Sequence, residues 1–305
     1  MNVVVATRGS KLSLIQAKAL ITALKSHADV KPKLKIVKTT GDMHRNTPLH
    51  EIGGKGLFEK EVDLAVARGD ADIAVHSLKD VPSRVPENIQ LTAVLPRESP
   101  LDALISKSHL KLRDLPSSSV IGTSSSRRRA ALLHLRPDLR VEPIRGNLDT
   151  RLRKLETQHY DAIVVAEAGL KRLGLGGLVD EVFGEDEIVP APCQGAIGVF
   201  TRVDDGEITR LVGRVNHETS MLEVSMEREF LRIVGGGCYV PVGVLARARN
   251  GGVEMISALY SSDGSKRVSV REIGTEDEAL EVARRTAETV LEEGGSILTS
   301  LGVSR

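Results

Sequence analysis

The 305-residue sequence is poor in cysteine and in aromatic residues. It contains two cysteines, Cys193 and Cys238, no tryptophan, three tyrosines and four phenylalanines. Two cysteines this far apart do not form a disulfide framework, and neither has neighbours at zinc-ligand spacing, so no metal site is expected. The few aromatic residues also argue against recognition of nucleic acid by base stacking.

The sequence also lacks a long apolar run and a net charge of one sign. No stretch approaches the ~18 apolar residues of a membrane-spanning helix, and the N-terminus has no signal-peptide pattern. We therefore expect a cytoplasmic protein with no membrane partner. The formal net charge is +1, from 42 Lys and Arg against 41 Asp and Glu, which argues against a general nucleic-acid binder.

The first two-thirds of the sequence alternate β-rich runs with helical patterns. Strands are predicted at 2–7, 34–39 and 72–77 and helices at 11–25 and 56–69, and the pattern restarts at residue 119. Such alternation predicts an α/β fold with parallel sheets and crossover helices. We interpret residues 96–106 and 189–200 as crossings between two βα domains that enclose a cleft, with domain 1 at 1–95 and 196–215 and domain 2 at 96–195.

The pattern changes near Glu218. A helix at 218–234 precedes three predicted strands, and a last helix opens with a capping box of Thr275 and Glu278. We therefore predict a smaller α+β domain at 216–305. Cys238 lies near its start, in the glycine-rich segment GGGCYVPVG at 235–243.

Arginine is concentrated in one region of this nearly neutral chain. Residues 122–153 contain eight arginines against three acidic residues. Arginine suits bidentate capture of carboxylate or phosphate groups. The count alone leaves a solvated basic surface as an open alternative.

Cationic and hydroxyl residues follow the predicted strands directly. Because open α/β sheets bind ligands at the carboxyl ends of their strands, these groups predict a site for an anion with several carboxylates or phosphates. For the serines, a simple helix N-cap is the alternative. The groups are Arg8 and Ser10, Lys79, Thr123 to Ser126 with Arg127 and Arg128, and Arg145 with Gly146 and Asn147.

One carboxylate, Asp80, lies among these cations at the end of the strand 72–77. It could pair with Lys79 or cap the turn at Pro82. The functional alternative is a general acid, or an anion that stabilises a developing positive charge.

Eight motifs in order resemble those of one family. They are ATRGSKL, GGKGLF, HSLKDVP, GTSSSRR, IRGNLDTRL, AGLKRLG, QGAIG and GGGCYVPVG, which span residues 5 to about 245. Each is weak alone, but together and in order they are highly specific. The sequence is similar to the porphobilinogen deaminase family, also called hydroxymethylbilane synthase.

The resemblance implies three domains, of which the first two are similar to periplasmic binding proteins, and a monomer. It implies a transferase of heme biosynthesis that condenses four porphobilinogen molecules head to tail into hydroxymethylbilane and releases ammonia. A dipyrromethane cofactor would be attached to Cys238 through a thioether, and Asp80 would be the catalytic residue. The runner-up is a non-catalytic two-domain anion-binding protein. A nucleic-acid patch at SSSRRR and a cysteine protease fit less well.

The resemblance also implies roles for further residues by motif position. Residues expected to hold the cofactor are Lys79, Ser77, Thr123, Ser124, Ser125, Arg127, Arg128, Arg145 and Gly146. Those expected to contact substrate are Arg8, Ser10, Gln16, Arg145, Arg151, Arg172 and Gln194, and those in a lid loop are Lys55 and Phe58. The sequence departs from the common pattern at Glu51, where many members have lysine, at Ser126, and at Pro192 with Cys193.

Overall fold

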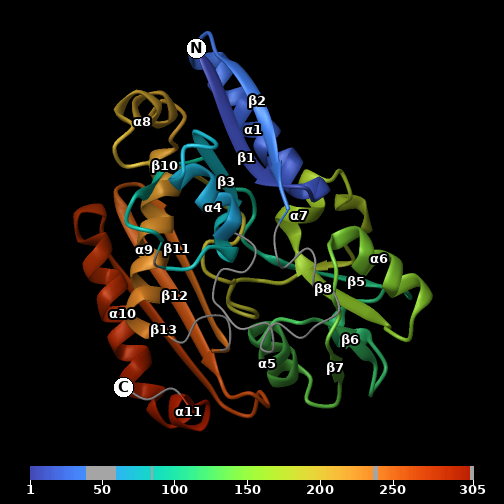
Figure 1. Ribbon diagram of the computed structural model, residues 1–305. Helices are drawn as coiled ribbons and strands as arrows, with labels where there is room; N and C mark the ends of the chain where they lie inside the picture. Colours follow the sequence, from blue (N-terminus) through green and yellow to red (C-terminus); the bar gives the residue numbers. More distant parts are fainter. Residues whose placement is uncertain (39–59, 84, 236–239, 303–305) are drawn as a thin grey trace. The chain divides into compact units, whose positions relative to one another are not determined.

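The computed structural model describes residues 1–38, 60–83, 85–235 and 240–302 (Figure 1). The chain forms two compact units, each assembled from two segments. Unit 1 comprises Met1–Glu98 and Gly195–Met221, and unit 2 comprises Ser99–Gln194 and Leu222–Arg305. The predicted separation of 96–195 from 216–305 stays a prediction, because most of both segments belongs to unit 2.

Unit 1 contains a five-stranded sheet in the order β2-β1-β3-β10-β4. Strand β10 runs antiparallel to its neighbours β3 and β4, so the sheet is mixed rather than wholly parallel as predicted. The reason is that β10 belongs to the segment that returns from unit 2. The strands are β1 (Asn2–Arg8), β2 (Lys31–Val37), β3 (Ile73–Ser77), β4 (Ile89–Val94) and β10 (Ile197–Arg202).

Three helices and one short turn complete the described part of unit 1: α1 (Lys11–His27), α4 (Lys60–Ala67), α8 (Gly206–Gly213) and the 3-10 turn η1 (Leu78–Asp80). The apolar runs of β1 and β3 are buried because helices cover the sheet. Val5 and Ile73 are fully buried with Leu20 and Leu24 of α1 in one core. Burial of such side chains stabilises the unit by about 1.5–3 kcal/mol each.

Unit 2 contains a second mixed sheet, in the order β7-β6-β8-β5-β9. Strand β5 lies inside the predicted crossing 96–106, which is therefore not simply a connection. Its apolar residues are buried between β8 and β9, and the two prolines that suggested a crossing precede it. The strands are β5 (Asp102–Ser106), β6 (Val120–Gly122), β7 (Arg140–Glu142), β8 (Ala162–Ala166) and β9 (Glu181–Val182).

Each helix of this part of unit 2 comes directly after a strand: α5 after β6, α6 after β7, and α7 after β8. They are α5 (Ser126–Leu135), α6 (Leu148–Thr157) and α7 (Glu167–Arg172), with 3-10 turns η2 (Leu112–Asp114) and η3 (Gly176–Leu178).

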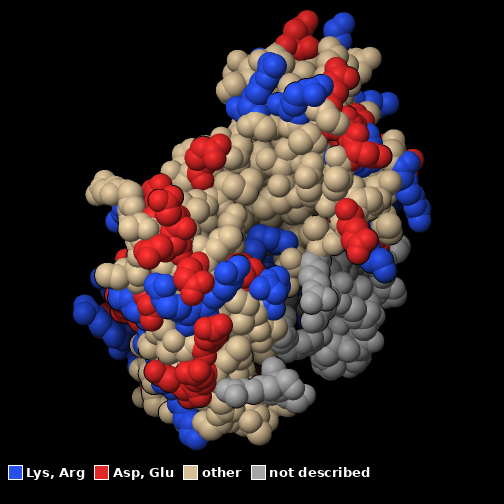
Figure 2. All heavy atoms as spheres, turned by 90° about the vertical axis from the view of Figure 1, so that its left-hand side faces the viewer, with Lys and Arg blue, Asp and Glu red and all other residues tan. Residues whose placement is uncertain are grey.

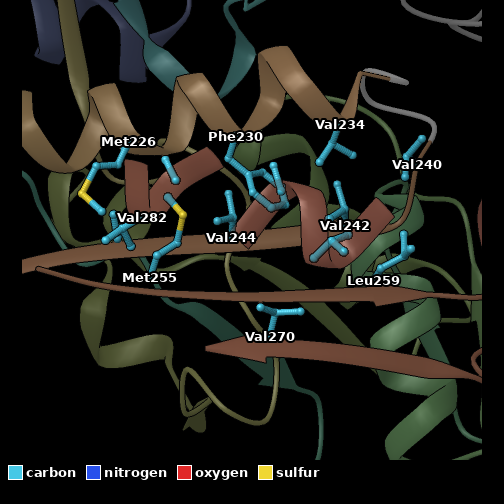
Figure 3. Close-up of a cluster of buried hydrophobic side chains, with 14 of the residues drawn as sticks. Met226, Phe230, Val234, Val240, Val242, Val244, Met255, Leu259, Val270 and Val282 are labelled. Atoms are coloured by element: carbon cyan, nitrogen blue, oxygen red, sulfur yellow. The ribbon is translucent and has the colours of Figure 1, made fainter. Parts of the chain in front are cut away.

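The C-terminal part of unit 2 is an antiparallel sheet covered by helices. The sheet order is β11-β12-β13, and the predicted capping box of Thr275 and Glu278 is present. Figure 3 shows Met226 and Phe230 of α9, Val244 of β11 and Val282 of α10 in one buried hydrophobic core. The elements are α9 (Glu218–Val234), β11 (Val242–Arg249), β12 (Gly252–Tyr260), β13 (Arg267–Thr275), η5 (Glu276–Glu278), α10 (Ala279–Glu293) and α11 (Gly295–Ser300).

Strand β11 is an edge strand whose outer amides have acceptors. The N–H of Val244 donates to the carbonyl of Pro190 at 2.9 Å. The N–H of Ala246 donates to Glu227 at 2.9 Å, and that of Ala248 to Glu223 at 3.2 Å. Both carboxylates come from α9 and are buried.

The predicted α/β class is confirmed by the two mixed sheets with flanking helices and the third, antiparallel sheet. Within the described residues, no helix is both long and apolar enough to cross a membrane. Figure 2 shows one face, on which Lys and Arg side chains lie interspersed with Asp and Glu.

Candidate active site

In unit 1 the predicted residues lie where two parallel strands end. Arg8 is the last residue of β1, and Ser77 is the last residue of the neighbouring strand β3. Ser10 caps α1, since its side chain accepts a hydrogen bond from the N–H of Ser13 at 3.1 Å. The carboxyl ends of β1 and β3 therefore bring Arg8 and the residues after Ser77 to the same edge of the sheet.

Asp80 lies on the short turn η1 that follows β3, and its side chain is exposed. Lys79 before it is half-buried, whereas Leu78 is buried. The N–H of Val81 donates to the carbonyl of Leu78 at 3.1 Å and closes the turn. The turn thus presents a carboxylate to solvent at the sheet edge.

Gln16 of α1 is buried, with 2% of its surface exposed. Its side-chain amide donates to the hydroxyl of Ser77 at 2.6 Å. The next strand residue inward, His76, is bonded to Asp63 of α4 at 2.8 Å. Sequence reasoning did not single out His76 or Asp63, because the bond between them appears only when α4 is packed on β3.

In unit 2 the predicted residues also follow parallel strands. Thr123, Ser124 and Ser125 connect β6 to α5, and Ser125 caps that helix by accepting from the N–H of Arg128 at 3.4 Å. The hydroxyl of Ser124 donates to the carbonyl of Ile144 at 2.7 Å. This bond joins the end of β6 to the segment after β7.

The segment after β7 carries Arg145, Gly146 and Arg151. Gly146 has φ +113°, and a Cβ there would lie 2.6 Å from the side chain of Thr150, so the turn requires glycine. The guanidinium of Arg151 donates to the carbonyl of Gly146 at 2.9 Å. Arg172, at the end of α7, is half-buried.

Arg127 and Arg128 form a buried cluster with Asp102 and Gln194, which we call the Asp102 cluster. Arg127 donates to one carboxylate oxygen of Asp102 at 2.7 Å, and Arg128 donates to the other through two nitrogens at 2.7 and 2.9 Å. Gln194 donates to Asp102 at 2.8 Å and accepts from Arg128 at 3.1 Å. Asp102 pairs with Ala166, so the cluster lies at the carboxyl end of β8.

The charges of the Asp102 cluster determine its protonation. Burial alone would raise the pKa of Asp102, but the charges of Arg127 and Arg128 and the hydrogen bonds outweigh burial and hold this pKa well below its usual range. Burial lowers the pKa of Arg127, and Asp102 opposes that effect. With both guanidiniums charged, the cluster contains two positive charges and one negative charge.

Sequence reasoning identified both arginines and Gln194 of this cluster but missed Asp102. The signal was an isolated Asp between Leu101 and Ala103, at the start of an apolar run. A buried carboxylate of this kind requires a positively charged partner.

Other predicted residues lie outside the described part of the chain. They are Lys55, Phe58, Cys238 and the departure at Glu51. Cys193 is described: it is buried, and its backbone N–H donates to Glu227. The described residues contain no group of three or more His, Cys, Asp or Glu side chains able to hold a metal ion.

Solved structures that resemble the fold include a methionine-binding protein, MetQ, at 13% identity and a TM-score of 0.45, covering 70% of this chain and 89% of that one. Another is a YaeC-family lipoprotein of Enterococcus faecalis, at 14% identity and a TM-score of 0.43, covering 74% and 96%.

Sequence relatives match almost the whole chain. A protein of Hyperthermus butylicus named a probable porphobilinogen deaminase is 47% identical and covers 94% of this chain and 95% of its own length. A porphobilinogen deaminase of Syntrophomonas wolfei is 42% identical over 97% of both chains. Two family models match: the dipyromethane cofactor binding domain of porphobilinogen deaminase at residues 3–210, and its C-terminal domain at 221–292. The chain belongs to the porphobilinogen deaminase family.

Proposed function

We propose that Asp80, with the strand-end residues named above, performs the family's reaction on a primer attached to Cys238. As a member of the family, the chain is a hydroxymethylbilane synthase, a transferase of tetrapyrrole biosynthesis. It condenses four porphobilinogen molecules head to tail and releases ammonia. The observation that carries the proposal for the site is the exposed carboxylate of Asp80 at the carboxyl edge of a sheet.

Asp80 acts on the pyrrole nitrogens of the substrate. Loss of ammonia from porphobilinogen leaves an electron-poor methylene group conjugated to the ring, and positive charge develops on the nitrogen. A carboxylate next to that N–H stabilises the charge and accepts or returns the proton. An acid on an exposed turn, rather than deep in the core, is accessible for this role.

Cationic and hydroxyl residues hold the acetate and propionate groups of the substrate. Each ring brings two carboxylates, and each ion pair at ~4 Å is worth about 4 kcal/mol at an effective dielectric near 20. Among the residues proposed for these contacts, Arg8 ends a strand and Ser10 caps a helix, where backbone N–H groups add to the attraction. The full set is Arg8, Ser10, Arg145, Arg151 and Arg172.

The described residues of unit 2 fit a polycarboxylate cofactor. The Asp102 cluster contains one more positive than negative charge in a buried position, and buried excess charge favours a nearby anion. The residues proposed to hold the cofactor are Ser77, Lys79, Thr123, Ser124, Ser125, Arg127, Arg128, Arg145 and Gly146. When bound through Cys238, the dipyrromethane supplies the free pyrrole carbon to which the first substrate unit is joined.

The test is the mass of the intact protein together with a colour reaction for pyrroles. The wild-type protein is expected to exceed its sequence mass by two pyrrole units and to give the colour. Cys238→Ser should lose the mass increment, the colour and turnover. The matched control is Cys193→Ser, which should keep all three because Cys193 is buried beside Glu227. An active Cys238→Ser protein of unmodified mass would refute the tether.

The reaction needs no nucleic acid, membrane or second subunit, and we propose a monomer that acts in the cytoplasm. The mixture of charges in Figure 2 supports the absence of a nucleic-acid surface on that face. Light scattering on the purified protein tests the monomer. The alternative of a non-catalytic anion-binding protein gains no support from the relatives.

A further inference from the structure

Three consecutive residues before Asp80 are each held by a different element of unit 1. His76 is 4% exposed, and its Nε2 lies 2.8 Å from Oδ1 of Asp63 on α4. Ser77 accepts a hydrogen bond from Gln16 on α1 at 2.6 Å. Leu78 is 1% exposed and lies against Gly198 of β10. Helix, helix and strand therefore converge on the segment that ends at Asp80.

The contact between Leu78 and Gly198 depends on the absence of a side chain at residue 198. A Cβ on Gly198 would lie 2.4 Å from Cδ2 and 2.6 Å from Cγ of Leu78. The N–H of Leu78 also donates to the carbonyl of Ala196 at 3.1 Å, so its backbone is fixed to the same segment. Any residue larger than glycine at 198 must displace Leu78.

The contact between His76 and Asp63 also restricts the position of the end of β3. Both side chains are buried, and the imidazole ring also packs edge-on against Phe200, with ring centroids 5.6 Å apart. Replacing such a pair by apolar residues often costs nothing or stabilises a protein. The stability of unit 1 therefore does not by itself require the contact between His76 and Asp63. The contact does attach the end of β3 to α4, and this fixes the direction of the backbone that leads to Asp80.

The turn itself contributes little to the position of Asp80. It is three residues long, and short 3-10 turns have few internal hydrogen bonds. The orientation of Asp80 therefore depends on the residues that anchor the turn, among them His76, Ser77 and Leu78. An error of ~1 Å in the position of a reacting group can reduce the rate about 100-fold.

We propose that Gly198, Gln16 and Asp63 are positioning residues for Asp80, acting through Leu78, Ser77 and His76 respectively. This inference rests on the proposed role of Asp80. It gives Gln16 a role through Ser77 in place of direct contact with substrate, and it gives the last glycine of the QGAIG motif a steric reason.

The central experiment adds a methyl group at residue 198 and then removes the side-chain atoms of Leu78 that it would meet. Gly198→Ala is expected to lower kcat about 10- to 100-fold while the cofactor mass increment and KM stay unchanged. In Gly198→Ala with Leu78→Ala, the atoms that would clash are gone, so kcat should recover relative to Gly198→Ala although the double variant has lost a buried leucine. The matched control is Gly213→Ala, where nothing lies within 4 Å of the added Cβ.

A purely structural role makes a different prediction. It would make kcat follow stability, so kcat and the unfolding free energy would change in parallel between Gly198→Ala and the double variant. That result, or full kcat in folded Gly198→Ala, would overturn the proposal.

Two further variants keep the test valid if Gly198→Ala does not fold. Gln16→Leu removes the donor to Ser77, and Asp63→Asn replaces the carboxylate that contacts His76. Each should lower kcat at unchanged KM, whereas a direct substrate contact by Gln16 would raise KM. All rates are measured on cofactor-loaded protein relative to wild type. An inactive wild type would refute the proposed function itself, so the two failures are distinguishable.

Discussion

The Asp80 turn in unit 1 and the Asp102 cluster in unit 2 are built at equivalent places but distribute charge in opposite ways. The Asp80 turn follows β3, which pairs with the antiparallel strand β10, and Asp102 begins the antiparallel strand β5 next to the carboxyl end of β8. In unit 1 the acid is exposed and its supports are buried. In unit 2 the acid is buried, and two arginines are paired with it. An acid available for chemistry and an acid that organises its surroundings are thus distinguished by burial.

Replacing the exposed carboxylate of Asp80 by an amide should have the largest effect on the reaction. Asp80→Asn is expected to reduce kcat about 10²- to 10⁴-fold, because the amide neither stabilises positive charge nor accepts a proton. The cofactor mass increment and the unfolding free energy should stay near wild type. Steady-state rates, intact mass and denaturant unfolding measure the three quantities. Near-normal turnover would remove Asp80 from the chemistry.

The same replacement at the buried acid, Asp102, should lower the unfolding free energy of the protein. Asp102→Asn leaves two buried guanidiniums without a negative partner and should lower the unfolding free energy by about 3–5 kcal/mol. The matched control is Asp138→Asn, which breaks the more exposed ion pair with Arg136 and should lower the unfolding free energy far less than Asp102→Asn does. Equal losses in the two variants would contradict the contrast between buried and exposed acids.

Low pH should remove the contribution of the Asp102 carboxylate to the unfolding free energy. The pKa of Asp102 is lowered in the folded protein, so the folded state binds the proton more weakly than the unfolded chain, where the pKa is about 3.9. The stabilisation is fully present above that value and is lost as the pH falls toward the folded pKa. The difference in unfolding free energy between wild type and Asp102→Asn should be constant from pH 8 to about 5 and narrow below about pH 4. A constant difference down to pH 2 would contradict this.

The serines that cap helices at the two sheet edges should show the smallest effects. Ser10→Ala and Ser125→Ala each remove an acceptor for a helix N–H and should cost about 1 kcal/mol. Asparagine at either position restores the cap. If Ser10→Asn has normal stability and a raised KM, Ser10 also contacts substrate; if Ser125→Asn has normal stability and a reduced cofactor mass increment, Ser125 also holds the cofactor. An unchanged value would leave that serine as a cap alone.

The sequence predicted the elements whose apolar patterns are long or strictly periodic. The helix at 218–234 matches α9, and the capping box at Thr275 is present. The strand predicted at 34–39 begins earlier, at Lys31, because pairing with β1 extends it. The antiparallel direction of β5 and β10 could not be predicted from the sequence. Each is the first strand after the chain passes from one unit to the other, and an apolar strand pattern does not show the direction in which such a strand joins its sheet.

Single site residues were predictable only where a motif marked them. Asp80 and the arginines stand in recognisable motifs, whereas Asp63 and His76 become a pair only through packing across α4 and β3. The burial of Arg127 and Arg128 was also invisible, because basic residues in a row resemble a solvated surface until Asp102 is brought against them.

The two glutamates of α9 that accept from the amides of β11 have a consequence for assembly of the chain. An open sheet edge is a template on which a strand from another molecule can add, and here the outward N–H groups of Ala246 and Ala248 are already occupied. Because α9 precedes β11 in the chain, the acceptors are synthesised before the strand that needs them. The edge is therefore protected from aggregation as soon as it forms.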